Sequence, residues 1–516
     1  MKKFVSSIFA IAMALAVTTS ATSCMPGGQT AGPIAGGDLG LDENFKCTIT
    51  VDGGGQWANF NTTDDMVESE TNPYPYNTLE KLAEEYTKLH PNITIKLNRQ
   101  SYNADLSTIR SLLTTQSAPD IVYNSTTTLA EDCNKNYYAV LDDYLQASNP
   151  YSKEGEKGKE KWFDIFGNDL KNTVDGHYYY VCMERGAMGM IYNKSFFTQH
   201  GIEEPETYSQ FLAAIEAIHA ADPNVVPYTP KGQELDMMYE STMYIDMMNE
   251  VDENKDGWAN SYEMTKAYYQ NIFDFEDERY RTLIKLLEAR LKYAEDPNKV
   301  TVVDSFLAGQ TMMCEATGNE IALTMKYAQE RGFEAGVFPL PALDTASYEG
   351  LDMFMTDGVG VRRGSSGLCT AWYITNHAFS SKDGEQNRKK INACVDFLMF
   401  LTAKTNNDRM INDKGVSVPL SGATNEKTKA FKPLIDVYMA DMADENKWSW
   451  DTFNSPATIG LSFYNASIRG KNDYFYGSST PKAKGDMDIL IAALKNGMDS
   501  SVEKLVKTHG WDTSKW

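Results

Sequence analysis

The stretch LEKLAEEYTKLHPNITIKL (residues 79–97) changes from a helical to an extended hydrophobic period within a few residues. Its apolar side chains first recur at intervals of three and four positions, at Leu79, Leu82, Ala83, Tyr86 and Leu89. This spacing predicts a helix, which we expect to end at His90-Pro91. Residues 93–97 then alternate between apolar and polar, and this alternation predicts a strand.

The same two periods recur on both sides of this stretch. An alternating, β-rich run at 47–51 precedes it, and helical spacing returns at 106–113 before a short apolar strand at 117–122. The order strand, helix, strand, helix, strand predicts a parallel sheet with crossover helices. The pattern restarts with two expected strands at 178–182 and 189–194 and a helix that opens at 204–208. The chain is therefore predicted to be an α/β protein.

Length and charge limit the class of protein. The formal net charge of −23 disfavours nucleic acid and anionic lipid surfaces as partners, because both would repel the chain. A body of nearly 500 residues is too long for one core and suits two or more domains. Six cysteines beyond the N-terminal region show no metal-like spacing. Free buried thiols are the favoured interpretation, and one or two disulfides stay open.

The N-terminus has the features of a secretory signal. Lys2 and Lys3 precede an apolar run at 4–17 that is shorter than a membrane span requires. Small residues then lead to Cys24, as in the lipobox of bacterial lipoproteins, although Ala21 stands where leucine is usual. We expect 1–23 to be a lipoprotein signal peptide, Cys24 to be lipidated, and the Gly- and Pro-rich residues 24–44 to form a flexible tether. An ordinary signal peptide is the alternative.

Several segments together resemble the extracellular solute-binding proteins that serve carbohydrate importers of the ABC type. The segments are YTKLHP (86–91) with the strand after it, APDI (118–121), IYNK (191–194) with EPETY (204–208), FLAGQ (306–310), and the stretch from Asp396 to Pro419. The resemblance implies two α/β lobes joined by a hinge, with a ligand cleft between them. It places 45–180 and 336–402 in the first lobe and 181–335 and 403–516 in the second. It also implies an oligosaccharide ligand, separate permease subunits as partners, and a monomer without enzymatic activity.

Residues 252–263 (DENKDGWANSYE) match the pattern D-x-[DN]-x-[DN]-G-x5-E at every required position. In such a loop, oxygens at positions 1, 3, 5, 7, 9 and 12 surround one Ca2+ ion, and glycine at position 6 permits the turn. Apolar residues at helical spacing flank the loop on both sides. We expect a structural Ca2+ ion here, and a solvated acidic turn is the alternative. The expected ligands are Asp252, Asn254, Asp256, the Trp258 carbonyl, Asn260 and Glu263.

Sugar recognition needs aromatic faces for the C–H side of the ring and planar polar groups for its hydroxyls. Such residues are expected on loops at the carboxyl ends of strands. The candidates in the first lobe and at the crossing between lobes are Gln56, Trp57, Asn59, Asn124, Ser125, Glu184 and Arg185. Those from the rest of the chain are Glu315, Asn319, Trp372, Trp448, Trp450 and Arg469. For each single tryptophan or arginine, a packing or surface role is the alternative.

Other classes of protein stay open as alternatives. A secreted glycoside hydrolase or polysaccharide lyase would need placed catalytic carboxylates, and no recognisable pair stands out among the 71 acidic residues. The sequence contains no HExxH, GxSxG or P-loop motif. A peptide-binding importer component would share the compartment and the hinge. A calcium-stabilised adhesin is the remaining alternative.

Overall fold

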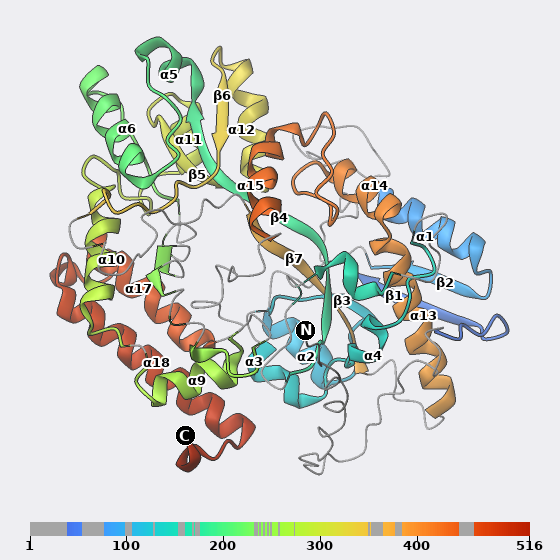
Figure 1. Cartoon of the computed structure of the whole chain (residues 1–516). Helices are drawn as coiled ribbons and strands as arrows, with labels where there is room; N and C mark the ends of the chain where they lie inside the picture. The colour runs from blue at the N-terminus through green and yellow to red at the C-terminus, as the bar shows by residue number, and fades with distance from the viewer. Residues whose placement is uncertain are drawn as a thin grey trace, which may run out of the picture. The chain divides into compact units, whose positions relative to one another are not determined.

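A computed structural model describes residues 39–53, 77–98, 106–126, 129–152, 160–167, 170, 176–231, 236, 239–240, 243–244, 247, 250–255, 259–272, 274–348, 351, 365–376, 384–442 and 459–516. The described chain is a mixed α/β structure built on one curled sheet (Figure 1). The strands are β1 (Cys47–Asp52), β2 (Ile93–Leu97), β3 (Ile121–Tyr123), β4 (Tyr180–Asn193), β5 (Met313–Thr317), β6 (Ala335–Phe338) and β7 (Ser365–Ile374).

The helices fall into two groups according to the strands that they cover. The first group is α1 (Thr78–Leu89), α2 (Leu106–Thr114), α3 (Leu129–Asp132), α4 (Asp142–Leu145), α13 (Gly384–Thr402) and α14 (Lys404–Lys414). The second is α5 (Lys194–His200), α6 (Tyr208–Ala221), α9 (Ser261–Tyr269), α10 (Glu278–Ala289), α11 (Val302–Leu307), α12 (Gly318–Glu330), α15 (Lys432–Met442), α17 (Leu461–Tyr476) and α18 (Met487–His509). Short 3₁₀ turns are η2 (Cys133–Lys135), η3 (Trp162–Ile165), η7 (Lys429–Phe431), η8 (Pro481–Ala483) and η9 (Thr513–Lys515).

The predicted parallel unit is present. β1 pairs in parallel with β2 on one side and with β3 on the other, and α1 and α2 make the crossovers. The helix α1 buries four of the residues that the spacing marked and leaves Leu89 exposed at its end. The strand β2 has the predicted bounds. The order of the sheet is β2-β1-β3-β7-β4-β5, and β6 pairs with β4.

The two strands predicted at 178–182 and 189–194 are wrong as separate elements. They are the ends of one long strand, β4, whose first half pairs with β7 and whose second half lies between β5 and β6. Residues 183–188 join them, because their backbone continues the antiparallel pairing with β7 as far as Ala187 and then pairs with β5 from Met188. This middle stretch is buried on both faces except at Gly186, so it shows no alternation that would predict a strand.

Each face of the sheet carries its own apolar core, because successive strand residues point to opposite faces. In β3, Ile121 joins a core with α1, α4, α13 and α14, while Val122 joins a core with α2 and α3. In β4, Met190 joins a core with α6, α10, α17 and α18, while Ile191 joins one with α11, α12 and α15. We call the first pair of cores, with the strands between them, the first lobe, and the second pair the second lobe.

Within the described residues, three chain segments pass between these lobes. They are β4, β7 and the stretch 414–420, which begins at the last residue of α14, and we call the place where they meet the crossing. Figure 1 shows α13 and α14 (orange) beside α1 (blue), so the late segment returns to the first lobe. The predicted lobe ranges stay a prediction. In two places, residues belong to a core of the other lobe than the predicted range gives them. Phe338, Leu340, Leu343 and Leu351 contribute to a second-lobe core, and Met410 and Ile411 contribute to a first-lobe core.

Two other expectations concern cysteines and membrane spans. The six cysteines that the structure describes are all free, and four of them are buried as expected, whereas Cys47 and Cys369 are partly exposed. Within the described ranges, no helix combines the length and apolar character needed to span a bilayer. The signal peptide, Cys24 and most of the tether lie outside the described residues.

Gly318 gives a direct test of the packing at the crossing. A Cβ on this residue would lie 1.8 Å from the Val416 carbonyl oxygen, so the backbone of α12 or of the crossing would have to shift. We expect Gly318→Ala to lower the free energy of unfolding by about 1–3 kcal/mol. Urea denaturation of purified protein measures the change.

Gly384→Ala is the matched control. Gly384 also begins a helix, α13, but a Cβ there meets no atom within 4 Å. This substitution is expected to be neutral or to stabilise by up to about 1 kcal/mol. Equal effects of the two substitutions would contradict the close approach of Val416 to α12.

Candidate ligand-binding site

The carboxyl end of β3 places polar residues at one edge of the first lobe. The β3 strand is followed at once by Asn124 and Ser125. Asn124 is buried, and its side-chain amide donates to the Tyr138 hydroxyl at 2.7 Å while its Oδ1 accepts from the Ser125 N–H at 2.9 Å. Its own N–H donates to the Ala371 carbonyl on β7 at 3.2 Å. The predicted candidates Asn124 and Ser125 therefore lie together, held against β7. Burial raises the pKa of Tyr138, so this phenol stays protonated and available as a hydrogen-bond partner.

Gln56, Trp57 and Asn59 follow β1, which is the neighbour of β3 in the parallel sheet. They lie outside the described residues, so their part in the site stays a prediction. Parallel strands end at the same edge of a sheet, and this rule is the reason for expecting them near Asn124.

Glu184 occupies the centre of the crossing and is only 3% exposed. One carboxylate oxygen accepts from the Thr370 hydroxyl of β7 at 2.5 Å and from the Lys414 ammonium at 2.8 Å. The other accepts from Lys414 at 2.9 Å and from the Ser417 hydroxyl. Because a carboxylate offers about four acceptor positions, these contacts occupy all of the hydrogen-bonding positions of Glu184. Glu184 therefore joins all three crossing segments.

Arg185, the next residue, binds the same segments through its backbone and its side chain. It exchanges two backbone hydrogen bonds with Val418, at 2.8 and 3.1 Å, and its Nε donates to the Leu420 carbonyl at 2.9 Å. The predicted pair Glu184 and Arg185 thus lies where it was expected, at the crossing. Both side chains contact protein groups, and ligand contact by either residue stays a prediction. Spacing alone missed Thr370, Lys414 and Ser417, which are the residues that hold Glu184.

On the second-lobe side, the strand β5 ends beside the crossing. Thr317 caps α12 in a capping box with Glu320, and Gly318 lies against Val416. Asn319 is the second residue of α12, at the end of the helix that faces the crossing segment. Glu315 is almost fully buried on β5 and accepts a short hydrogen bond from the Tyr228 hydroxyl. Burial, and then the Glu315 charge, raise the pKa of Tyr228.

Two ion pairs lie buried behind β5, and the sequence analysis did not anticipate them. Arg290 on α10 contacts Asp236 at 2.5 Å, and Lys471 on α17 contacts Glu240 at 2.8 Å. Burial raises the pKa of Glu240, and Lys471 partly offsets this effect. The sequence of α17 did indicate a buried lysine, because Lys471 lies at helical spacing between Ser467 and Tyr474, which are both buried. Its partner could not be inferred, because Glu240 is 231 positions away.

The remaining candidates are buried in a core, exposed on α17, or outside the described residues. Trp372 is fully buried in the first-lobe core shared with α1 and α13, which is the packing role given as its alternative. Arg469 is exposed on α17. Trp448 and Trp450 lie outside the described residues. The structure therefore brings together Asn124, Ser125, Glu184 and Arg185 along β7, with the start of α12 across the crossing.

The predicted calcium loop leads directly into α9. Asp252 and Glu263 are both nearly fully buried, and one Glu263 oxygen accepts from the Glu253 and Asn254 N–H groups at 3.0 and 3.2 Å. The Asn260 side chain caps α9, and its own N–H donates to the other Glu263 oxygen at 3.0 Å. These contacts fold the loop around Glu263. The side chains of the loop are rich in oxygen atoms, which are the ligands that Ca2+ prefers.

Asp256 and Trp258 lie outside the described residues, and within the described part no group of three or more acidic, cysteine or histidine residues is arranged for a metal. Calcium binding therefore stays a prediction.

Residues 71–367, more than half of the chain, match the profile of the family described as bacterial extracellular solute-binding protein. No curated protein sequence matches the chain.

Solved structures of such proteins resemble the chain in fold. A family 1 extracellular solute-binding protein from Bifidobacterium longum subsp. infantis is 15% identical, with a TM-score of 0.55 over 88% of this chain and all of that one. The apo form of RafE from Streptococcus pneumoniae is 17% identical, with a TM-score of 0.53 over 88% of this chain and 98% of that one. GacH of Streptomyces glaucescens, solved unliganded and with acarbose, is 16% identical, with a TM-score of 0.52 over 89% and 99%.

The buried Glu184–Lys414 pair can be tested by removing one partner. Lys414→Met leaves a buried carboxylate without its cation, so we expect a loss of about 3–5 kcal/mol in the free energy of unfolding. A second substitution, Glu184→Gln, in the same chain is expected to recover part of the loss, because the uncompensated charge is gone. Urea denaturation measures all variants.

Lys404→Met provides the control on the same helix. Lys404 pairs with Asp408 at 2.5 Å, but its side chain is 48% exposed, so its removal is expected to cost less than about 1 kcal/mol. A loss at Lys414 no larger than that at Lys404 would show that the crossing does not depend on the buried pair.

Proposed function

Because the chain belongs to the family of bacterial extracellular solute-binding proteins, we propose that it binds a carbohydrate outside the cell and delivers it to an ABC-type importer. The observation that carries this proposal is the family match over residues 71–367, which includes β2 to β6, the start of β7 and the first part of the crossing. Among the proteins of similar fold, RafE has been solved with raffinose and GacH with acarbose. An oligosaccharide is therefore the ligand class that we favour.

The residues at the edge of the first lobe suit the hydroxyls of a sugar. Asn124 offers an amide and Ser125 a hydroxyl, and both groups donate and accept hydrogen bonds. Tyr138 and the β7 backbone fix the orientation of Asn124. A fixed polar group loses little freedom when a ligand binds, which favours affinity. Trp57, Trp448 and Trp450 stay our proposed stacking residues, and their aromatic faces would cover the apolar side of the sugar ring.

The proposed mechanism is closure of the two lobes on the sugar. Glu184 ties the three crossing segments together, so the lobes can tilt about the crossing while their own cores stay intact. A ligand that contacts both lobes favours the closed form through its differential affinity for the two states. The closed protein then presents the sugar to separate permease subunits, and the chain acts as a monomer without catalysing a reaction.

We further propose that Cys24 carries a lipid that anchors the protein outside the cytoplasm, with 24–44 as the tether. The calcium loop is proposed to be structural. It links the chain before Asp252 to α9, and α9 packs against α18 of the second lobe.

Ligand binding can be tested by thermal unfolding of the 25–516 fragment with neutral and acidic oligosaccharides and with peptides. A ligand that binds only the folded state stabilises it by roughly 2.7 kcal/mol at 100 times its Kd. We expect one class of glycan to raise the midpoint and to be recovered unchanged by mass spectrometry. Cleavage of that glycan would favour the glycoside hydrolase or lyase, and a midpoint that responds to peptides alone would favour the peptide importer.

Calcium binding is tested by the response to a chelator. We expect chelation to lower the unfolding midpoint of the wild type and to have no effect on Asp252→Asn, which loses the first carboxylate of the loop. Glu278→Gln, an exposed change at the start of α10, should keep the wild-type response. A wild-type midpoint that does not move with chelator would remove calcium from the proposal.

A further inference from the structure

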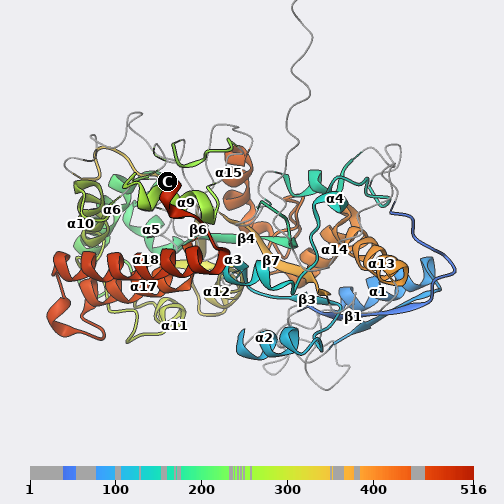
Figure 2. The same ribbon diagram turned by 90° about the horizontal axis from the view of Figure 1, so that it is seen from below.

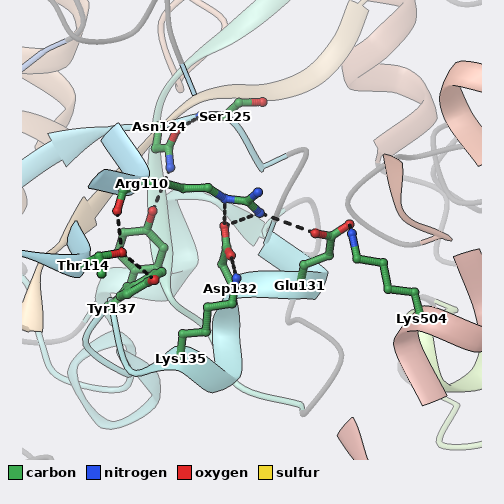
Figure 3. A network of polar contacts seen from close by, with 10 residues as sticks. Arg110, Thr114, Asn124, Ser125, Glu131, Asp132, Lys135, Tyr137 and Lys504 are labelled. Atoms are coloured by element: carbon green, nitrogen blue, oxygen red, sulfur yellow. Dashed lines mark hydrogen bonds and ion pairs between the residues drawn. The ribbon is translucent and has the colours of Figure 1, made fainter. Parts of the chain in front are cut away.

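A second set of contacts joins the two lobes away from the crossing. The Lys504 ammonium on α18 lies 2.5 Å from a Glu131 carboxylate oxygen on α3 (Figure 3). Four residues further along α18, the Thr508 carbonyl accepts a hydrogen bond of 2.9 Å from the Asn134 side chain in η2. The helix α18 packs in a second-lobe core, whereas α3 and η2 pack in a first-lobe core. These contacts therefore link elements that the sheet does not connect directly.

The first-lobe partner is held in place by its own neighbours. Arg110 on α2 lies 3.5 Å from Glu131 and 2.8 Å from Asp132, and Lys135 contacts Asp132 at 2.6 Å. The carboxylates of Glu131 and Asp132 are thus surrounded by cationic side chains (Figure 3). The Glu131 side chain is 11% exposed, and it contacts Arg110 of its own lobe as well as Lys504, so the first lobe itself helps to orient it. A fixed partner loses less side-chain entropy on pairing than a free one.

The second-lobe partner is equally well supported. Leu494, Met498, Val502 and Leu505 bury one face of α18 in its core. On another side, the Tyr268 hydroxyl of α9 donates to Asp499 at 2.8 Å. The end of α18 is therefore a rigid element, and it carries Lys504 and Thr508 toward α3.

An apolar contact accompanies the polar ones. Trp511, just after α18, packs against the first-lobe core that contains Leu129 and Cys133. Its ring also lies 5.2 Å from Tyr262 on α9 and stacks on His509 at 5.0 Å. The tryptophan thus bridges the α9–α18 pair and the first lobe.

The position of these contacts relates them to the candidate site. The chain runs from Asn124 to α3 through only four residues, so the first-lobe side of the contact adjoins the proposed sugar-binding edge. Figures 1 and 2 both show the end of α18 beside α3, and in Figure 1 this contact lies apart from the place where β4 meets β7. A tilt of the lobes about the crossing that separates α3 from α18 must break the Lys504, Thr508 and Trp511 contacts together.

We propose that Glu131, Asn134, Lys504, Thr508 and Trp511 form a latch that favours the closed arrangement of the lobes before any ligand binds. This inference rests on the proposed function, because it concerns regulation of the same site. The latch raises the fraction of protein in the closed form, and the apparent Kd of a ligand that prefers this form falls in proportion. Since Lys504 is 52% exposed, the ion pair is partly screened by salt.

The test compares Lys504→Met with Lys507→Met in the full soluble fragment. Lys507 is an exposed lysine on the same helix, and the structure gives it no ion pair within the described residues. Small-angle X-ray scattering without ligand is expected to give a larger radius of gyration for Lys504→Met and for Glu131→Gln than for Lys507→Met. Raising the salt to 1 M, where the Debye length is about 3 Å, should extend the wild type but leave Lys504→Met unchanged.

The glycan that stabilises the wild type supplies the second readout. Its apparent Kd should rise about threefold in Lys504→Met and stay at the wild-type value in Lys507→Met, as expected for loss of one partly exposed ion pair. Identical scattering and identical affinities for the two lysine variants would overturn the latch, even if glycans bind. A scattering difference in a protein that binds no glycan would support the latch and overturn the proposed function.

Discussion

Burying a carboxylate is costly unless donors satisfy it, and at Glu184 those donors come from separate parts of the chain. Thr370 belongs to β7, Lys414 is the last residue of α14, and Ser417 belongs to the segment after it. Without their contacts the negative charge would be uncompensated at a place where the chain passes between lobes three times. Cys369, which is partly exposed, lies beside it, and desolvation together with the Glu184 charge raises the pKa of its thiol to about 12. Both oxygens of the Glu184 carboxylate are thus paired at this junction.

This junction explains how one sheet serves two lobes. The strand β4 pairs with β7 before the crossing and with β5 and β6 after it, so the same strand belongs to both halves. The polar residues that the sequence marked for sugar binding follow β3 on one side of the junction and β5 on the other. A ligand that contacted both sides would favour one angle between the lobes. In our proposal, the contact of Lys504 with Glu131, away from the junction, also favours one such angle. In the proposed mechanism, recognition and closure therefore depend on the same arrangement of strands.

Local patterns were enough to predict much of the first lobe. The helix α1 and the strand β2 follow from the spacing of their own apolar residues, and the parallel order of β1, β2 and β3 follows from their sequence order. The continuity of β4 was missed because its middle is buried on both faces and has no alternation. The partners of Glu184 were missed because Lys414 is 230 positions away, and nothing local connects the two. Packing of Trp372 in the core also depends on distant elements, here α1 and α13.

Hydrogen exchange measured by mass spectrometry, with and without a stabilising oligosaccharide, tests the central claim most directly. The account predicts slower exchange in the β3–α3 turn around Asn124 and, at the same glycan concentration, in the β5–α12 turn around Gly318. Protection on both sides of the crossing would mean that one ligand holds both lobes. Protection confined to one side, or absent from both while the glycan binds, would contradict closure about Glu184.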